Sequence, residues 1–356
     1  MALPGRPAAC AGGAVPSIGG ARPEPRAVVA IPLYNGARTL DRAVRSMLAQ
    51  EYRSFAVILV DDCSTDDTAA VAERWAQRDG RIAFRRNARR LGLVGNWRRC
   101  FEVARELFPQ AEYFAWGSDH DWWAPRWLAS LASALDESAA AVLAFPQPYA
   151  LAEDGELAKL GGGVDTSGLR EPGRRMGAMS TSGGAGFMVY GLFRTRALER
   201  AGPFPGVLAP DKLLLVRLSL VGTFVRVDEV LWHRSKIERG RLPRHQRATL
   251  FPGRAPWHAW LPVWVVHGVA LFVQLGLGRG RPEISRRRGM GYGLLYPIDR
   301  LRHSIRRHQR HLEGRGRRLR RRFRRGPGRS VRNLRRRLRR GWEVVQGLAR
   351  SLRGLG

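Results

Sequence analysis

Two aspartates, Asp119 and Asp121, follow an apolar run in the stretch YFAWGSDHDWWAP (Tyr113–Pro125). Residues two apart in an extended segment face the same side. Two like charges on one side repel unless a cation lies between them, and Mg and Mn ions favour carboxylates together with substrate phosphates. The pair therefore indicates metal-assisted handling of a diphosphate. A loop acid followed by a helix cap explains an isolated Asp-x-Asp equally well.

Tryptophans flank the aspartate pair at Trp116, Trp122 and Trp123. Tryptophan is costly to leave in water on a loop, and its ring stacks well on sugars and bases. This clustering favours a ligand site over a simple cap. We expect Trp116 and Trp122 to stack on a sugar or an acceptor.

A second acidic pair, Asp61 and Asp62, ends the apolar run of ILVDDCSTDDT (Ile58–Thr68). A carboxylate at the end of a strand can accept a hydrogen bond from a nucleobase N–H. A helix cap explains the hydroxyls and later acids of this stretch, but it does not explain the pair itself.

A third candidate segment is IPLYNGARTL (Ile31–Leu40), where a strand ends in a turn. Tyr34 has a ring that can stack on a base, and Asn35 and Gly36 form the turn. An ordinary strand-to-helix turn explains this segment equally well when it is taken alone.

The elements that must position these residues alternate between short apolar runs and helical spacing. Five strands are predicted, over Ala27–Leu33, Phe55–Val60, Arg81–Arg85, Tyr113–Trp116 and Ala139–Phe145. Four helices are predicted between them, over Ala37–Gln50, Thr65–Gln77, Leu93–Phe108 and Pro125–Leu135. This alternation predicts an α/β fold with a mostly parallel central sheet flanked by helices. Ligands bind at the carboxyl ends of such strands, so the three candidate segments should share one rim.

The order of these motifs resembles the family 2 glycosyltransferases. The motifs on which the resemblance rests are, in chain order, a strand ending in P-x-Y-N, then V-D-D-x-S-x-D-x-T, then NARRLGLVGNW (Asn87–Trp97), then the Asp-x-Asp region. The resemblance covers roughly residues 27–240. It implies the GT-A fold, which is Rossmann-like, a nucleotide-diphosphate sugar as donor, and transfer to an acceptor hydroxyl with inversion.

The resemblance also implies roles for the donor side of the site. Pro32, Tyr34 and Asn35 would line the nucleotide pocket, and Leu91 and Gly92 would lie against the nucleoside.

The two acidic pairs receive separate roles. Asp62, with Asp61 behind it, would contact the base. Asp121 would hold a divalent metal, Mn or Mg, on the diphosphate, while Asp119 would contact ribose or metal. The common family form has adjacent acids here, whereas this chain has His120 between them.

The resemblance places the catalytic base at Asp211, in LAPDKLLLVRLSLVG (Leu208–Gly222). Relatives often carry a Glu–Asp pair there, but the preceding residue in this chain is Pro210. An acid interacting with the helix dipole is the alternative. His233 and Arg234 follow a predicted strand over Thr223–Val230 and would approach the diphosphate. Residues 160–186 are rich in glycine and predict a loop.

The C-terminal third carries most of the charge. The chain has 356 residues and a net charge of +32, and residues 281–356 hold 26 arginines against four acids. Ala259–Gly278 is uncharged, and we expect it to lie on a membrane or pack on protein rather than to span a bilayer. Apolar residues from Val331 to Leu352 recur at three and four residues, which predicts a basic amphipathic helix. Such a segment attracts anionic lipid, and nucleic acid is the less favoured partner.

We predict four regions: a disordered leader (1–26), a glycosyltransferase domain (27–240), an apolar helical extension (241–298), and an Arg-rich helical or partly disordered tail (299–356). The predicted function is metal-dependent sugar transfer to a saccharide or lipid-linked acceptor, in cell-surface polysaccharide or glycolipid synthesis. The predicted location is peripheral, at the cytoplasmic face of the membrane. The alternatives are a catalytically degenerate relative, or a protein that binds nucleic acid or membrane through its tail. A nucleotidyltransferase is disfavoured because the first loop has a single glycine and a single arginine.

Overall fold

The structure is a computed structural model. It describes residues 24–147, 149–151, 157–159, 163–182, 185–202, 204–235, 247, 250–251, 255–278 and 284–323. The chain divides into two compact units, residues 1–301 and 302–356. Nearly all of the predicted leader lies outside the described residues, as do the predicted boundary at residue 240 and the apolar stripe that begins at Val331.

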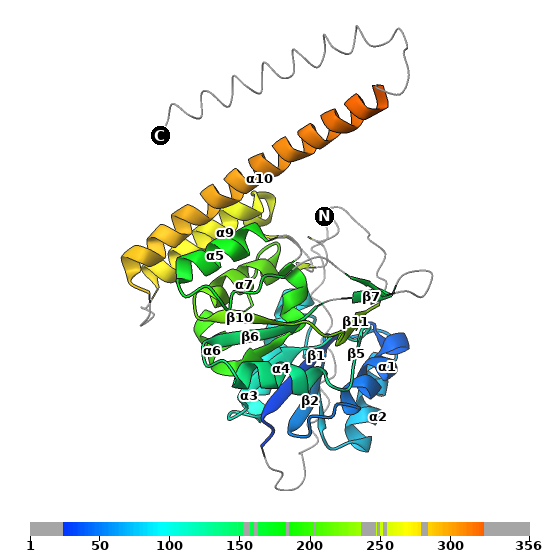
Figure 1. The fold of residues 1–356 in the computed structure, drawn as a ribbon. Helices are drawn as coiled ribbons and strands as arrows, with labels where there is room; N and C mark the ends of the chain where they lie inside the picture. Colours follow the sequence, from blue (N-terminus) through cyan, green and yellow to red (C-terminus); the bar gives the residue numbers. More distant parts are fainter. Residues whose placement is uncertain are drawn as a thin grey trace, which may run out of the picture. The chain divides into compact units, whose positions relative to one another are not determined.

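A seven-stranded sheet forms the centre of the first unit (Figure 1). Its strands are β1 (Ala27–Leu33), β2 (Phe55–Asp61), β3 (Ile82–Arg86), β4 (Tyr113–Trp116), β6 (Ala141–Pro146), β9 (Leu192–Arg194) and β10 (Thr223–Val227). The strand order is β10-β6-β9-β4-β1-β2-β3, and only β9 runs antiparallel to its neighbours. The predicted mostly parallel sheet is therefore confirmed.

Alternation along β1 explains why its sequence is a continuous apolar run. Val28 and Ala30 point into one hydrophobic core, while Val29 and Ile31 point into the other. Because both faces are covered, both sets of side chains must be apolar. The functional groups are consequently confined to the ends of the strands.

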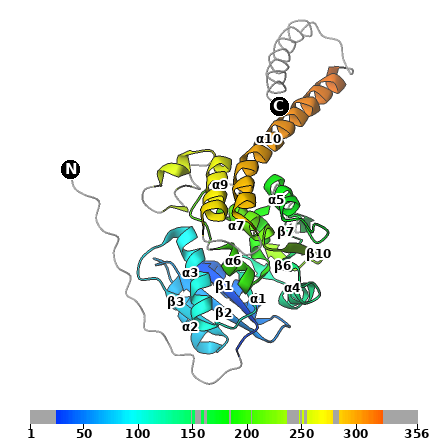
Figure 2. The ribbon, with the colours of Figure 1, turned by 90° about the vertical axis from the view of Figure 1, so that its left-hand side faces the viewer.

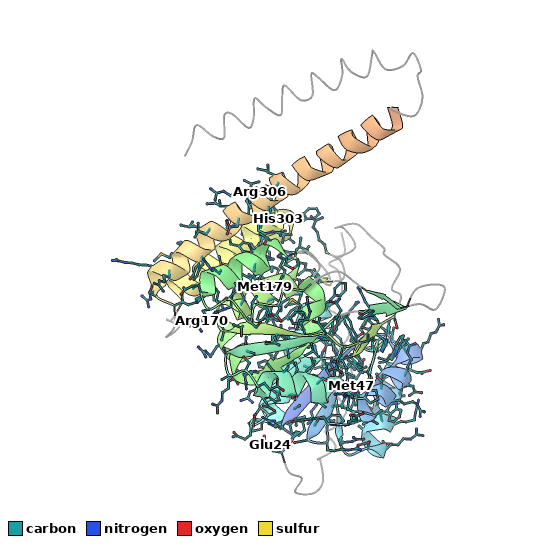
Figure 3. All side chains as sticks on the ribbon, in the orientation of Figure 1. Glu24, Met47, Arg170, Met179, His303 and Arg306 are labelled. Carbon is teal, nitrogen blue, oxygen red and sulfur yellow. The ribbon has the colours of Figure 1, made fainter. Side chains whose placement is uncertain are left out.

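Helices cover both faces of the sheet. They are α1 (Ala37–Leu48), α2 (Thr68–Arg78), α3 (Gly92–Leu107), α4 (Trp127–Asp136), α5 (Pro172–Thr181), α6 (Thr195–Ala201) and α7 (Pro210–Ser219). Side chains of α1, α2 and α4 fill one core, and those of α3, α6 and α7 fill the other. Figure 3 shows side chains filling the space between these layers.

A second, smaller sheet has the strand order β5-β11-β7-β8. Its strands are β5 (Trp122–Trp123), β7 (Tyr149–Leu151), β8 (Leu157–Lys159) and β11 (Trp232–Arg234). In β11, Trp232 pairs with Trp123 and His233 pairs with Trp122. This pairing brings residues 232–235 to the Asp119–Asp121 segment, from more than 100 residues away in the chain.

Two predicted helices differ from the observed ones. The helix predicted from Thr65 begins at Thr68, because Ser64 and Thr65 are engaged by Asp61 and Asn35 instead. The apolar stretch Ala259–Gly278 is divided among three elements. They are the 3-10 helix η2 (Trp257–Trp260), α9 (Val263–Phe272) and the π-helical η3 (Val273–Leu277).

The helix α10 (Arg286–Phe323) lies beside α9 over its first part (Figure 2). The 3-10 helix η1 (Ala185–Tyr190) begins at the end of the predicted glycine-rich loop, residues 160–186, and leads into β9. The helix α5 lies inside that segment, so the loop prediction is wrong there. Among the described residues, no helix is both long enough and apolar enough to cross a bilayer.

Candidate functional site

In the first part of the rim, hydrogen bonds join the loop after β1 to the loop after β2. Asn35 lies in the left-handed region at φ 53°, and its backbone N–H donates to Ser64 Oγ at 2.9 Å. Its side-chain Oδ1 accepts from the backbone N–H of Thr65 at 2.9 Å. The Gly36 N–H donates to Thr68 Oγ1 at 2.8 Å. Asn35 therefore has a structural role that fixes the shape of this rim. Asparagine is a residue type that is enriched at such left-handed positions.

Asp61 is fully enclosed by protein donors. Its carboxylate accepts from the N–H and hydroxyl of Ser64, and Arg86 Nε lies 3.1 Å from Oδ2. Burial raises the pKa of Asp61, and the Ser64 hydrogen bonds and the Arg86 charge oppose that rise. This carboxylate comes just before Asp62 in the chain, and its hydrogen bonds with Ser64 hold the loop after β2 in place.

Asp62 is equally enclosed, which corrects its predicted contact with a base. Oδ1 accepts from Asn87 Nδ2 at 3.0 Å and from the Leu91 N–H at 2.7 Å, and Oδ2 accepts from the Gly92 N–H at 2.8 Å. Only 2% of its surface is exposed. In this structure the carboxylate anchors the start of α3 and does not face the rim. Leu91 and Gly92 are held here as its donors.

Tyr34 is the exposed aromatic group of the donor-side rim. Its ring is covered by the guanidinium of Arg90, whose Cζ lies 4.0 Å from the ring centroid. A cation over a ring is a stabilising arrangement, and it leaves an arginine charge next to the predicted nucleotide pocket. Pro32 is half-buried on β1, opposite Val60 of β2.

Asp119, His120 and Asp121 form a compact acid–imidazole cluster after β4. His120 Nδ1 lies 2.6 Å from Asp119 Oδ1, and His120 Nε2 lies 4.0 Å from Asp121 Oδ1. Burial lowers the pKa of His120, but the Asp119 hydrogen bond and the charges of both aspartates raise it above its ordinary value. A Cβ built on Gly36 would overlap Asp119 Oδ2, so only glycine leaves room for this carboxylate against the β1 loop.

Residues 232–235 complete the cluster from the second sheet. Trp232 Nε1–H donates to Asp121 Oδ2 at 3.2 Å, and the Ser235 N–H donates to Asp121 Oδ1 at 2.9 Å. Arg42 donates to the His120 carbonyl and to Ser235 Oγ. Burial raises the pKa of Asp121, while His120 and the Ser235 N–H oppose the rise.

The tryptophan predictions need correction. Trp116 is 2% exposed, packs on Trp97 in the core and donates its indole N–H to the Trp97 carbonyl, so the prediction that it stacks on a ligand is wrong. Trp122 is partly exposed, but its ring stacks on His233 with 5.2 Å between centroids, and Arg42 lies over it at 4.5 Å. These contacts engage the Trp122 ring in this structure, and its stacking on a ligand stays a prediction.

The predicted diphosphate residues lie close to the acid cluster. Burial lowers the pKa of His233, so its imidazole is neutral at pH 7 and adds no positive charge there. Arg234 packs over the ring of Phe187, with 5.0 Å from Cζ to the centroid, and its charge lowers the pKa of Asp121.

Asp211 lies in the first turn of α7, where the chain turns sharply. The preceding cap, Ala209, is left-handed at φ 49°, and Pro210 starts the helix with its fixed φ. Burial raises the pKa of Asp211, and the backbone N–H groups of Lys212 and Asp211 oppose the rise. A Cβ on Gly186 would overlap Asp211 Oδ2, so the carboxylate lies directly against η1.

Tyr190 belongs to η1, the element that Asp211 packs against, and no sequence pattern indicated it. Its ring stacks on Trp232, with 4.9 Å between centroids. Burial raises the pKa of its phenol, and the charges of Asp121, Asp119 and Asp211 raise it further. The Tyr190 ring stacks on the residue that donates to Asp121, and its own element η1 packs against Asp211, so it lies between the two acidic segments. Tyr190 follows an apolar run and is not distinguishable there from an ordinary core residue.

A family match covers the part of this arrangement that precedes Tyr190 in the chain. Residues 28–189 match the model of the family described as glycosyl transferase family 2. They include the β1 and β2 loops, the Asp62 anchor and the acid–imidazole cluster. Residues 28–189 form a family 2 glycosyltransferase domain. The predicted family is confirmed, and Asp211 lies beyond the matched residues.

Relatives resemble parts of the chain. An uncharacterized protein of Mycobacterium tuberculosis, MT1568, is 44% identical over 82 residues, which are 23% of this chain and 25% of that protein. Glycosyltransferase AglD of Haloferax volcanii is 38% identical over 84 residues, 22% of this chain and 13% of that protein. The alignments thus span a quarter or less of the length of these relatives.

A solved structure resembles the family 2 domain and its surroundings. TarS 1-349 of S. aureus, in complex with UDP-GlcNAc, aligns with a TM-score of 0.54 over 76% of this chain and 71% of that chain. The sequence identity is 15%, so the likeness establishes the fold. The predicted GT-A architecture is confirmed by this likeness and by the strand order.

The possible metal ligands of the family 2 domain suit a metal ion that is also bound by the substrate. Among the residues that the structure describes, no three His, Cys, Asp or Glu side chains form a metal-binding group. Mg and Mn sites in phosphate-transfer proteins commonly use one or two carboxylates, with the remaining ligands from phosphate and water. Asp119 Oδ2 and Asp121 Oδ1, beside His120, fit that smaller demand. Asp121 would have to exchange part of its hydrogen bonding with Ser235 for such a contact.

Proposed function

We propose that this chain transfers a sugar from a nucleotide-diphosphate sugar to an acceptor hydroxyl, with inversion at the anomeric carbon. The observation that carries the proposal is the Asp119–His120–Asp121 cluster after β4 of a family 2 domain, which Trp232 and Tyr190 connect to η1 and Asp211. The same fold holds UDP-GlcNAc in TarS, which supports the class of donor.

The enclosed carboxylate of Asp211 is the proposed general base. It accepts the proton of the acceptor hydroxyl as the acceptor oxygen forms its bond to the anomeric carbon. The bond from that carbon to the diphosphate oxygen breaks on the opposite side, so the configuration inverts. The nucleoside diphosphate leaves with the electron pair. A base with a raised pKa accepts a proton more readily, which suits this role.

Asp119 and Asp121 are the proposed ligands for a divalent cation, Mn or Mg. Such a cation would supply neutralisation of the charge that develops on the leaving diphosphate. The Arg234 guanidinium lies near Asp121 and adds a fixed positive charge to the same region. Tyr34 and Arg90, on the far side of the rim, are the proposed contacts for the nucleoside.

We further propose a saccharide or lipid-linked acceptor, in the synthesis of a surface polysaccharide or glycolipid. Nucleotide sugars are cytoplasmic metabolites, so the proposed location is the cytoplasmic face of a membrane. These finer assignments follow from the family and from the basic C-terminal sequence.

The test is thermal unfolding of the full chain with a panel of nucleoside diphosphates, each with Mn, with Mg and with EDTA. A ligand that binds only the folded state stabilises it by about 2.7 kcal/mol at 100 times its dissociation constant. We expect a metal-dependent rise in Tm with one base, and a smaller rise in Asp119→Asn. Glu137→Gln is the control, since Glu137 is exposed and bonds locally to Ser133.

Two outcomes would contradict the proposal. If no nucleoside diphosphate raises Tm in folded protein, the chain is a catalytically degenerate relative. If the rise is the same in EDTA and in Asp119→Asn, the metal assignment is wrong, although the donor class stands. Release of nucleoside diphosphate from the matching sugar donor then distinguishes transfer from simple binding.

A further inference from the structure

The α9–α10 helix pair has an apolar face that no described residue covers. On α9 and η3, Val269, Val273 and Leu277 are spaced by four residues and are 50–65% exposed. On α10, Leu294, Ile298 and Leu301 follow the same helical spacing and are 43–60% exposed. Residues three or four apart share one face of a helix. We call these six residues the outer face.

The opposite sides of both helices pack on the body. His267 and Leu271 of α9 are fully buried, and Gln274 donates to the Ala201 carbonyl at 3.0 Å. On α10, Tyr296 is buried and Arg300 donates to the Ser180 carbonyl at 2.7 Å. Each helix therefore buries one side against the enzyme and directs the outer face away from it.

Glycines allow α10 to pack closely against α9 and η3, so that they form one rigid unit. A Cβ on Gly268 would meet Pro297, one on Gly276 would meet Met290, and one on Gly293 would meet Phe272. Such close approach of helix backbones leaves little freedom for the pair to turn its apolar stripes inward. The outer face is a built surface of rigid geometry, and exposed apolar patches of this kind mark interaction sites.

The charges beside the outer face identify its occupant. Arg286, Arg287 and Arg288 open α10 and are all exposed. A second copy of this chain would bring two such arginine clusters together, which is unfavourable. An anionic lipid surface offers both an apolar interior and negative headgroups. Trp257 and Trp260, 77% and 66% exposed just before α9, are of the residue type enriched at such interfaces.

We propose that the outer face docks on an anionic lipid bilayer, with its six apolar side chains below the headgroups and Arg286–Arg288 at headgroup level. A helix of this kind lies in the interface with its apolar side buried by about 5–10 Å. This surface belongs to the same compact unit as the candidate active site, residues 1–301.

The docked helices connect directly to the candidate base. His267 Nε2 donates to the Leu208 carbonyl at 2.8 Å, and Tyr296 donates to His267 Nδ1 at 3.1 Å. Leu208 precedes Asp211 by three residues. Resting on the proposed function, this contact implies that the acceptor side of the site backs onto the lipid surface. A protein held at a lipid surface by these helices would meet a lipid-linked acceptor there, and this is the substrate class that the surface favours.

The test is co-sedimentation of the full chain with vesicles of phosphatidylcholine alone or with phosphatidylglycerol, at low and high salt. We expect binding to phosphatidylglycerol vesicles that persists in part at high salt, because apolar burial is not screened. Val273→Ser/Ile298→Ser should weaken that binding ~10–100-fold, since each buried aliphatic side chain contributes roughly a factor of ten. The matched control is Val230→Ser, a residue of similar exposure (38%) outside the outer face.

A charge variant keeps the proposal testable if the serine variant folds poorly. Arg286→Glu/Arg287→Glu/Arg288→Glu should reduce binding at low salt and change it little at high salt. The proposal is overturned if the outer-face variant binds like wild type at both salt concentrations, or if all binding disappears at high salt. It is also overturned if wild type is a dimer that Val273→Ser/Ile298→Ser dissociates without loss of vesicle binding. No donor sugar is present, so failure here leaves the proposed transfer untouched.

Discussion

Asp62 and Asp211 are both carboxylates of the first unit, but Asp62 is buried whereas Asp211 is half-buried, and their surroundings differ. Asp62 has three protein donors on its two oxygens, from Asn87, Leu91 and Gly92. Asp211 has backbone donors from its own helix turn, and within the described residues no side chain donates to it. Its Oδ2 lies instead against Gly186, where a side chain would not fit.

This difference separates a structural acid from a reactive one. A carboxylate whose lone pairs are filled by protein donors stabilises the fold and has nothing left for a substrate. A desolvated carboxylate with few donors is unstable in its charged form, and a proton from a substrate relieves that instability. On the donor side of the rim, the acids after β2 are of the first kind. Asp211, the proposed base, is of the second kind.

The largest expected effect is on catalysis by Asp211→Asn. Loss of a general base commonly lowers kcat by ~10²–10⁴-fold, and we expect a loss in that range. The free energy of unfolding should stay the same or rise, because the substitution removes a desolvated charge. Steady-state release of nucleoside diphosphate and urea unfolding measure the two quantities.

A pH profile provides the control for this substitution. The pKa of Asp211 is raised, so kcat should fall as pH drops through a value above the ordinary 3.8 of an aspartate. This acid limb should be absent from the residual activity of Asp211→Asn. A profile that is identical in wild type and variant would assign the base to another group.

The next largest expected effect is a loss of stability in Asp62→Asn. Asp62→Asn places an amide N–H₂ where the carboxylate now receives backbone N–H groups of Leu91 and Gly92. Hydrogen bonds to charged groups contribute about 1.5–3 kcal/mol, so we expect about 2–3 kcal/mol lower unfolding free energy. Urea unfolding checks this value.

The comparison fails if Asp62→Asn keeps wild-type stability and loses nucleotide binding. That result would return Asp62 to the base-contacting role that the resemblance implies. The matched control is Asp67→Asn, which changes an acid of the same loop that has no side-chain cap bond to α2.

Sequence patterns were sufficient for six of the seven strands of the large sheet, all except β9, because periodicity and burial are coupled. The run Ala27–Leu33 is apolar throughout, and alternate residues of it do fill two separate cores. The rim followed from the same logic, since Asn35 and Asp61 end neighbouring parallel strands. The family motifs were equally visible, because they stand at these strand ends.

Long-range pairing was the part that no local pattern encodes. Trp116 and Trp122 are similar in sequence context, but only the fold shows that Trp97 encloses one and His233 stacks on the other. The partners of Asp121 come from Trp232 and Ser235, over 110 residues away. Whether a carboxylate is satisfied depends on such partners. The spacing of residues in the sequence therefore located the acids, but it did not show which of them are satisfied by protein donors.

The smallest expected effect concerns a third kind of acid, half-exposed and paired with a cation. Asp136 accepts from both terminal nitrogens of Arg26, at 2.8 and 2.6 Å, and also accepts from the Tyr113 hydroxyl. Because Arg26 and Asp136 are 36% and 40% exposed, solvent screens the pair. Asp136→Asn should therefore lower the unfolding free energy by only ~1 kcal/mol.

The pH dependence of that loss tests its electrostatic origin. Arg26 lowers the pKa of Asp136 in the folded state, so the folded value lies below the unfolded one. The stabilisation is thus complete above the unfolded pKa of about 3.9 and disappears as pH falls through the folded pKa. The difference between wild type and Asp136→Asn should shrink over that acid range, and added salt should shrink it at neutral pH. The control Asp228→Asn, whose partner Arg226 is two residues away and whose carboxylate is 68% exposed, should show almost no difference. A pH-independent loss in Asp136→Asn would mean that packing against Tyr113, and not charge, gives this acid its role.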